Sequence, residues 1–241
     1  MNALLRPWWN TLVELLYPSH CFGCGQAVEE GCTLCAACEG QVRRIRPPCC
    51  ATCSRPFPGS AGIVPDCPNC EDQTFAFESA VAVVQAQGLA RELIHRFKYQ
   101  RQFHLRRVLG AWLLAGFSDP RLEPEPVDAL VPVPLHPVRL RERGYNQAEA
   151  LASVVSRQTG VPVTPCLQRV RYTLTQTRFD RLERRRNLRG AFALRKNTGV
   201  TGQRLLLIDD VLTTGSTLHE CAAVLLDRGA RSVRALTVAR G

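Results

Sequence analysis

Long apolar stretches are absent from this 241-residue sequence, and their absence argues against a membrane-spanning helix. No segment approaches the ~18 apolar residues that such a helix needs. Residues 2–16 contain Arg6, Pro7, Asn10 and Glu14, so they also lack the unbroken apolar core and the small-residue cleavage site of a secretory signal. We therefore expect no membrane span and a cytoplasmic location.

Cysteine is scarce after residue 70, where only Cys166 and Cys221 occur, and we interpret these two as small buried hydrophobic residues. Ten cysteines lie at or before residue 70, and eight of them form C-x2-C pairs. Without a secretory signal a disulfide framework is not expected, so the pairs favour metal binding. The four pairs are Cys21/Cys24, Cys35/Cys38, Cys50/Cys53 and Cys67/Cys70.

Pairing of these knuckles in sequence order predicts two structural zinc sites. Two facing C-x2-C turns present four thiolates tetrahedrally to Zn2+, at ~2.3 Å each. Residues 1–78 contain little aliphatic material for a core, so metal would supply much of the folding free energy. A catalytic zinc is disfavoured, because no histidine or carboxylate replaces a thiolate within the pairs.

Three other cysteine arrangements remain open at this point. A redox C-x2-C motif normally occurs singly beside a βαβ unit. An iron–sulfur cluster uses the same ligand type, and a cross-braced zinc arrangement would join the first knuckle to the third. Cys32 and Cys49 lie outside the pairs and complicate the ligand assignment.

Acidic residues are outnumbered by basic ones only in the later part of the chain. Residues 1–80 hold five basic and eight acidic side chains, a net charge of −3, whereas residues 81–241 hold 26 and 13, a net charge of +13. This basic excess suits a polyanionic small molecule or a nucleic acid equally well.

The most informative segment is Leu205–Thr217, LLLIDDVLTTGST. Its apolar run predicts a strand buried on both faces of a parallel sheet, followed by a polar loop that opens a helix. The hydroxyl-rich loop offers successive backbone N–H groups at a helix N-terminus, which suits a phosphate dianion. Asp209 and Asp210 lie where they would accept hydrogen bonds from vicinal hydroxyls, so a 5-phosphorylated ribose fits the segment.

A second polar turn follows the predicted strand Ala129–Val133. Prolines make the sequence Pro134-Leu135-His136-Pro137 a rigid, non-helical turn. Ligands of parallel sheets lie beyond the carboxyl ends of the strands, so this turn and the hydroxyl-rich loop would face one cleft. Arg139 and Arg143 could hold a pyrophosphate there bidentately, unless they are ordinary loop residues.

Two arginine-rich segments have less specific interpretations. Arg91–Arg107 is either a solvated helical face or an anion-facing ridge. Gln168–Lys196 contains ten basic and two acidic residues, and we interpret it as a mobile cationic flap over the cleft or as an arm that contacts nucleic acid. The flap residues of interest are Gln176, Arg184, Arg186 and Asn187.

Predicted strands alternate with predicted helices from residue 79 onward. Helices are expected at about 89–99, 105–117, 148–157 and 218–226, and strands at 80–84, 129–133 and 233–238 besides the strand before the acidic pair. This alternation predicts an α/β fold, with a mostly parallel twisted sheet and helices on both faces.

The DDVLTTGST segment resembles the phosphoribosyl pyrophosphate (PRPP) signature of type I phosphoribosyltransferases. That resemblance implies that Asp209 and Asp210 are catalytic residues that hold the ribose hydroxyls, and that Mg2+ accompanies PRPP. It implies 5-phosphate binding by the loop, whose candidate residues are Val211, Thr213, Thr214, Gly215, Ser216 and Thr217.

Nearly the whole chain resembles the ComF family, through its cysteine pairs, VPVPLH, RERGYNQ and DDVLTTGST. The family implies an N-terminal helix and a double zinc ribbon in residues 1–78, fused to a type I phosphoribosyltransferase domain in residues 79–241. It makes Pro134, Leu135, His136, Arg139 and Arg143 the pyrophosphate loop. It further implies a role in natural competence, with single-stranded DNA and the competence machinery as partners and phosphoribosyl transfer to an unknown acceptor. The alternative is a non-catalytic nucleic-acid-binding module with a relic or sensory phosphate pocket.

Overall fold

A computed structural model of the chain describes residues 19–57, 66–71, 73–122, 126–172 and 187–241. Among these residues, no helix combines the length and the apolar character that crossing a membrane requires.

The elements follow the predicted alternation closely. In chain order they are α2 (Ala36–Gly40), β1 (Ala80–Gln85), α3 (Gly88–Tyr99), the short 3-10 helix η1 (Phe103–Leu105), α4 (Arg106–Phe117), β2 (Ala129–Pro132), α5 (Pro137–Arg143), α6 (Gln147–Thr159), β3 (Leu167–Arg169), β4 (Phe192–Leu194), β5 (Arg204–Leu212), α8 (Ser216–Asp227) and β6 (Ser232–Arg240). The expected strands and helices of the later part of the chain are all present within one or two residues of their predicted ends, except that β5 extends further.

A four-stranded, fully parallel sheet in the order β1-β6-β5-β2 forms the centre of the fold. Its inner strands β5 and β6 pair from Arg204↔Ser232 to Leu212↔Arg240. The edge strand β2 ends where Pro132 pairs with Ile208, so β5 continues past it by four residues. The acidic pair lies in this overhang, inside β5, whereas the sequence placed it at the strand's end.

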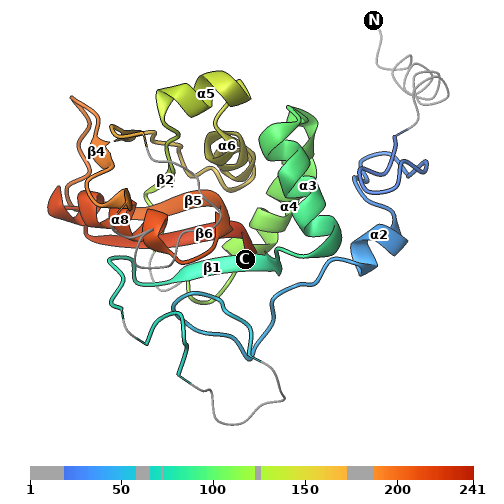
Figure 1. Cartoon of the computed structure of the whole chain (residues 1–241), viewed down its shortest axis with the longest axis horizontal. Coiled ribbons are helices and arrows are strands. Elements are labelled where there is room, and N and C mark those ends of the chain that lie inside the picture. The colour runs from blue at the N-terminus through green and yellow to red at the C-terminus, as the bar shows by residue number, and fades with distance from the viewer. Residues whose placement is uncertain (1–18, 58–65, 72, 123–125, 173–186) are drawn as a thin grey trace, which may run out of the picture.

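Two apolar cores cover the two faces of the sheet, because alternate residues of each strand point to opposite sides. Leu206, Ile208 and Leu236 pack with α3, α4 and α6 on one face. Leu205 and Leu207 pack with α8 on the other. Figure 1 shows α3, α4 and α6 grouped on one side of the sheet, with α8 beside β5 and β6. The predicted α/β class, with a parallel sheet and helices on both faces, is confirmed.

Each cysteine group joins a different one of these cores. Cys21 and Cys38 pack against the core of α3 and α4, whereas Cys50, Cys53 and Cys67 pack against the core of α8. The first knuckle region lies beside α3, where Arg96 donates to the carbonyl of Phe22, and the second lies beside β1, where Ala80 N–H donates to the carbonyl of Thr52.

Two expectations about the loops were wrong in part. The segment after His136 forms the helix α5, because Pro137 occupies the first helical position, where its missing N–H costs nothing and its fixed φ favours the helix. The ends of the presumed flap are ordered as the antiparallel strands β3 and β4, paired from Leu167↔Leu194 to Arg169↔Phe192. Leu167 and Phe192 are buried, so this pair contributes apolar surface to a core despite its basic sequence.

Candidate functional site: two cysteine clusters and an acidic pair beside a phosphate loop

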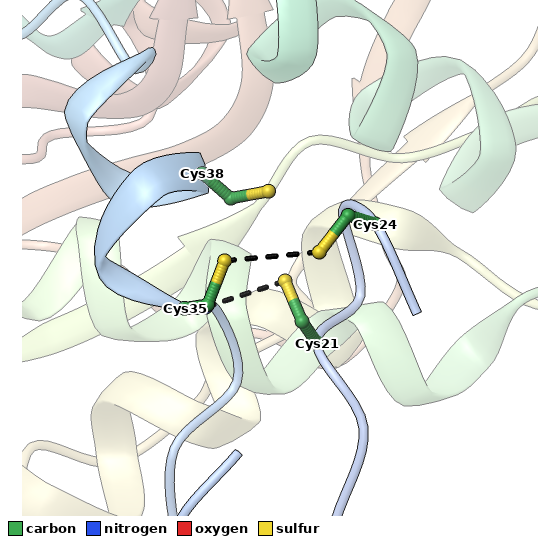
Figure 2. A group of neighbouring side chains, drawn as sticks. All are labelled: Cys21, Cys24, Cys35 and Cys38. Atoms are coloured by element: carbon green, nitrogen blue, oxygen red, sulfur yellow. Dashed lines mark hydrogen bonds between the residues drawn. The ribbon is translucent and has the colours of Figure 1, made fainter. Parts of the chain in front are cut away.

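The first cysteine cluster brings together Cys21, Cys24, Cys35 and Cys38, whose sulfurs all lie within 4.8 Å of one another. Figure 2 shows the four side chains pointing toward a common centre. The Sγ atoms of Cys24 and Cys35 are 3.7 Å apart, which matches the ~3.8 Å between two thiolates that share a tetrahedral Zn2+. A disulfide would require about 2 Å.

The second cluster has the same geometry. Cys50, Cys53, Cys67 and Cys70 form it, with Sγ–Sγ distances of 3.7 Å between Cys50 and Cys70 and 3.6 Å between Cys53 and Cys67. The clusters join the knuckles in sequence order, so the cross-braced alternative is wrong. Cys32 and Cys49 belong to neither cluster. The two groups fit two structural zinc sites.

Backbone groups around the first cluster favour the thiolate that metal binding needs. The N–H of Cys35 donates a hydrogen bond of 3.2 Å to Cys21 Sγ. Burial opposes ionisation, but backbone N–H groups, including those of Cys24 and Cys35, outweigh it and lower the pKa of Cys21 to about 6. The turn also requires Gly23, since a Cβ there would lie 2.7 Å from Cys38 Sγ.

The acidic pair occupies the overhang of β5. Asp210 is buried, with 6% of its surface exposed, and its N–H donates a hydrogen bond of 2.9 Å to Asp209 Oδ1. Lys98, from the last turn of α3, places Nζ 2.9 Å from Asp210 Oδ1. Only one-fifth of the Lys98 side chain is exposed, so this ion pair is largely shielded from water.

The ionisation of the acidic pair depends on burial and on the charges of neighbouring side chains. Burial raises the pKa of Asp209 to about 7, the negative charge of Asp210 acts in the same direction, and Lys98 opposes both. For Lys98, burial favours the neutral amine, but the charge and hydrogen bond of Asp210 outweigh it and raise the lysine's pKa. Near neutral pH, Asp209 therefore exchanges a proton readily.

The hydroxyl-rich loop follows β5 directly and leads into α8. Gly215 has φ +84° and caps the helix, which begins at Ser216. The hydroxyls of Thr214 and Ser216 are 3.0 Å apart. Thr213 is exposed. The loop therefore offers N–H groups and hydroxyls at the carboxyl edge of the sheet, at the start of a three-turn helix whose dipole favours an anion.

A small cavity of about 20 Å3 lies between this loop and β5. It is lined by Asp209, Val211, Leu212, Thr213, Gly215, Thr217 and Leu218. This volume accepts about one water molecule. A phosphate dianion is larger, so it would have to occupy the mouth of the cavity or displace the exposed part of the loop.

The proline-rich turn lies beside the acidic pair. Val133 N–H donates to the carbonyl of Ile208, which immediately precedes Asp209. Asn146 Nδ2 donates to the carbonyl of Val133 at 3.1 Å and thereby ties the turn to the start of α6. His136 caps α5, because its Nδ1 accepts a hydrogen bond from Val138 N–H. Pro134 and Leu135 complete this turn between β2 and α5.

Arginines from α5 and β3 approach the same region. Burial lowers the pKa of Arg169, the charge of Asp209 opposes that effect, and Arg139 and Arg143 add to it. Arg169 therefore lies within electrostatic range of Asp209, and Arg139 and Arg143 lie within electrostatic range of Arg169. Arg143 also donates to Gln147 Oε1 at 3.0 Å.

Of the presumed flap residues, Gln176, Arg184 and Arg186 lie outside the described residues. Asn187 is described, and its carbonyl accepts a hydrogen bond of 2.6 Å from Arg171 Nη2. None of the contacts found for Asn187 in the described part of the chain reaches Asp209 or Asp210.

Comparisons with known proteins account for both halves of this arrangement. A family model described as a double zinc ribbon domain matches residues 12–72, and one described as a phosphoribosyl transferase domain matches residues 132–241. Competence protein F of Haemophilus influenzae is 32% identical over 225 residues, which cover 92% of this chain and 95% of that protein. The chain belongs to the ComF family.

Two further relatives extend over most of the chain. The DNA utilization protein YhgH of Escherichia coli (strain K12) is 30% identical over 233 residues, 94% of this chain and 99% of that protein. Competence protein ComFC of Bacillus subtilis is 28% identical over 214 residues, 86% of this chain and 84% of that protein. The predicted combination of a double zinc ribbon with a phosphoribosyltransferase fold is confirmed.

Sequence reasoning missed two residues of the ComF-type site. Lys98 was assigned to a basic helical face, and Arg169 was not singled out at all. Their approach to the acidic pair depends on how α3 and β3 pack around the sheet, which no local motif specifies. One signal was present for Lys98: it is one of only two lysines among 31 basic residues.

Proposed function

We propose that this ComF-type protein binds PRPP at the carboxyl edge of its sheet. The observation that carries the proposal is the direct continuation of one strand from a buried carboxylate pair into a hydroxyl-rich helix N-terminus. The carboxylates would accept hydrogen bonds from the ribose 2- and 3-hydroxyls, and residues 213–217 would bind the 5-phosphate. Arg139 and Arg143 would face the pyrophosphate.

Mg2+ fits this site as a companion of the ligand. Outside the two cysteine clusters, the residues described hold no group of three side chains with metal-ligand geometry. Magnesium commonly binds through substrate phosphates with few protein ligands, so we propose that it arrives on the pyrophosphate. When bound, it would neutralise charge on the departing pyrophosphate.

The chemistry we propose is transfer of the phosphoribosyl group to an acceptor that remains to be found. The bond from C1 of the ribose to the pyrophosphate would break, and a bond to the acceptor would form, through an oxocarbenium-like centre. The protein would hold the ribose through Asp209 and Asp210 and would stabilise the pyrophosphate with arginine. Exclusion of water would prevent simple hydrolysis.

Calorimetric titration of Mg2+-PRPP into zinc-replete protein tests the proposal. Asp209→Asn/Asp210→Asn should abolish binding, because it removes the charged acceptors of the ribose hydroxyls. Asp227→Asn is the matched control, since that side chain is 81% exposed at the end of α8. Absence of saturable heat in the wild-type protein would contradict PRPP binding, as would equal affinity in the double variant and the control. Release of pyrophosphate on addition of candidate acceptors would then test transfer.

A second candidate function is single-stranded nucleic-acid binding, and a specific surface favours it. Tyr99, Phe103 and Tyr172 are 55%, 40% and 41% exposed. An arginine guanidinium lies over each ring, at 5.1 Å for Tyr99, 3.9 Å for Phe103 and 5.5 Å for Tyr172. Exposed aromatic rings beside arginines form stacking platforms for unpaired bases. The names of the relatives, competence and DNA utilization proteins, agree with this interpretation.

Fluorescence anisotropy with a labelled single-stranded oligonucleotide tests the second function. Tyr99→Ala/Phe103→Ala should weaken binding by about tenfold or more, given ~1–3 kcal/mol per stacked base. Binding should fall steeply with salt in the wild-type protein. If PRPP binding were absent while this interaction persisted in Asp209→Asn/Asp210→Asn, the nucleic-acid module would be the better account of the protein.

For the cell, we propose a cytoplasmic role in natural competence, in the handling of imported single-stranded DNA. We also propose that the chain divides near residue 78, just before β1 begins at Ala80. The double zinc ribbon would then be the first domain and the PRPP-binding unit the second.

A further inference from the structure

Lysine is rare in this protein, and one of its two lysines lies at the candidate site. The sequence holds 29 arginines but only Lys98 and Lys196. Lys196 is exposed, whereas Lys98 is largely buried with its ammonium 2.9 Å from Asp210. Although the chain is rich in arginine, the cation that pairs with the buried carboxylate of Asp210 is therefore a lysine.

The choice of lysine has a physical consequence. An ammonium group is a compact point charge, whereas a guanidinium is a broad planar fork that commonly engages both carboxylate oxygens. Lys98 contacts Oδ1 of Asp210. The contact therefore holds the carboxylate with a point charge rather than with a planar fork.

The RGYNQ segment positions this lysine. Tyr145 donates its hydroxyl hydrogen to the carbonyl of Phe97, the residue before Lys98. The Tyr145 ring also packs against the rings of Phe97 and Phe103, at centroid distances of 5.3 and 4.9 Å. Asn146, the next residue, holds the carbonyl of Val133. The segment thereby fixes the end of α3 and the proline-rich turn relative to each other.

We propose that Lys98 is a positioning residue that orients the Asp210 carboxylate and stabilises negative charge on the acidic pair of the unliganded ribose site, and that Tyr145 holds Lys98 in place. The inference rests on the proposed binding of a phosphorylated ribose at the acidic pair. It assigns the RGYNQ segment a scaffolding role, in which Tyr145 and Asn146 make no direct phosphate contact.

The charges around the acidic pair determine how many protons it holds. Asp209 lies within electrostatic range of Asp210 on its own strand, Lys98 from α3, Arg169 from β3 and Cys221 from α8. Lys98 stabilises one negative charge on the pair, and the second carboxyl retains a proton near neutral pH. An ionised carboxylate accepts a hydrogen bond more strongly than a neutral carboxyl, so binding of the ribose hydroxyls should release a proton from Asp209, with affinity rising as pH increases toward 8.

The pH dependence of Mg2+-PRPP affinity tests the assignment in full-length, zinc-replete protein. Lys98→Met should move the midpoint of the affinity–pH profile upward by about one unit or more, because an opposite charge near a carboxyl shifts its pKa by ~1–3 units. Lys98→Arg should retain the wild-type midpoint even if its larger group weakens affinity. Lys196→Met is the control for loss of one positive charge and should leave the profile unchanged.

Two outcomes would overturn the assignment: an unshifted midpoint in Lys98→Met, or the same upward shift in Lys98→Arg. A merely structural role for Lys98 would lower affinity equally at every pH. Tyr145→Phe keeps the ring but removes the hydroxyl, and should shift the midpoint in the same direction by a smaller amount. A midpoint identical to that of the wild-type protein would remove Tyr145 from the proposal.

A ligand-free measurement separates this inference from the proposed function. Without Lys98, the negative charge of the acidic pair would be buried without this cation, so the melting temperature of Lys98→Met should fall further below that of the wild-type protein as pH rises from 6 to 9. If the wild-type protein bound no PRPP, the proposed function would be wrong. The comparison of melting temperatures would still test the role of Lys98. A melting-temperature difference independent of pH would show that Lys98 does not control the charge of the acidic pair.

Discussion

Phe75 lies directly against Gly215, so an aromatic ring from the segment before β1 covers the loop between β5 and α8. A Cβ built on Gly215 would be 2.7 Å from Phe75 Cε1, and Gly215 has φ +84°. The neighbouring Ala76 N–H donates to His219 Nδ1 of α8 at 3.0 Å. The ribbon side of the chain therefore fixes the shape of the candidate phosphate loop.

Replacing Gly215 with alanine should consequently damage the fold and the loop together. A left-handed φ costs an L-residue roughly 1–2 kcal/mol, and the clash with Phe75 adds to it, so we expect a loss of about 2–3 kcal/mol of unfolding free energy. Urea denaturation measures this loss. Gly199→Ala is the control, because Gly199 is exposed and a Cβ there meets nothing within 4 Å. Equal stability of the two variants would mean that Phe75 does not constrain the loop.

Much of this fold could be predicted because its signals are local. The apolar run that ends at Ile208 specifies a strand buried on both faces, and the hydroxyls after Leu212 specify a helix start. The C-x2-C pairs specify metal knuckles, because few other arrangements use that spacing. These features needed no knowledge of which elements pack together.

The remaining features depend on packing between distant segments. The ion pair of Lys98 and Asp210 joins residues 112 positions apart in sequence, and the contact of Phe75 with Gly215 spans a similar separation. The pairing of β3 with β4 was missed because charged residues masked the buried Leu167 and Phe192. No local pattern encodes such contacts, so the charge balance of the acidic pair emerged only from the structure.

Removal of one zinc ligand from the second cluster should destabilise the sheet domain itself. Cys53 is fully buried in the core that contains α8, so Cys53→Ser should leave one zinc per chain and lower the melting temperature by several degrees. Bound zinc, measured colorimetrically after denaturation, and thermal unfolding provide the two readouts. Cys32→Ser changes a cysteine outside both clusters and should retain two zinc ions. Loss of zinc in that control would contradict the ligand assignment.

The hydroxyl of Ser54 should contribute strongly to the contact between the second knuckle and the sheet. It donates to the carbonyl of Ala80 at 2.8 Å and accepts from Ala82 N–H at 3.0 Å. Ser54→Ala would leave these buried groups without partners, so we expect a loss of about 2 kcal/mol in urea unfolding. Ser153→Ala, which removes a bond to the preceding turn of its own helix, should cost far less. Similar losses in both variants would contradict this account.

Neutralising Asp209 should stabilise the unliganded protein, by an amount that grows with pH. Burial and the charge of Asp210 raise the pKa of Asp209 to about 7, whereas an unfolded aspartate titrates near 4. The folded chain therefore binds this proton more tightly, and ionisation costs stability progressively as pH rises from about 4 through 7. Asp209→Asn removes that cost, so its gain should be about 2–3 kcal/mol larger at pH 8 than at pH 5. Thermal unfolding across this range, with exposed Asp227→Asn as control, measures the difference. A gain in stability that stays constant or shrinks with pH would mean that Asp209 is already ionised in the folded protein at the lower pH. A gain that grows with pH, accompanied by lost ligand affinity, would identify Asp209 as a residue that binds ligand at the expense of stability.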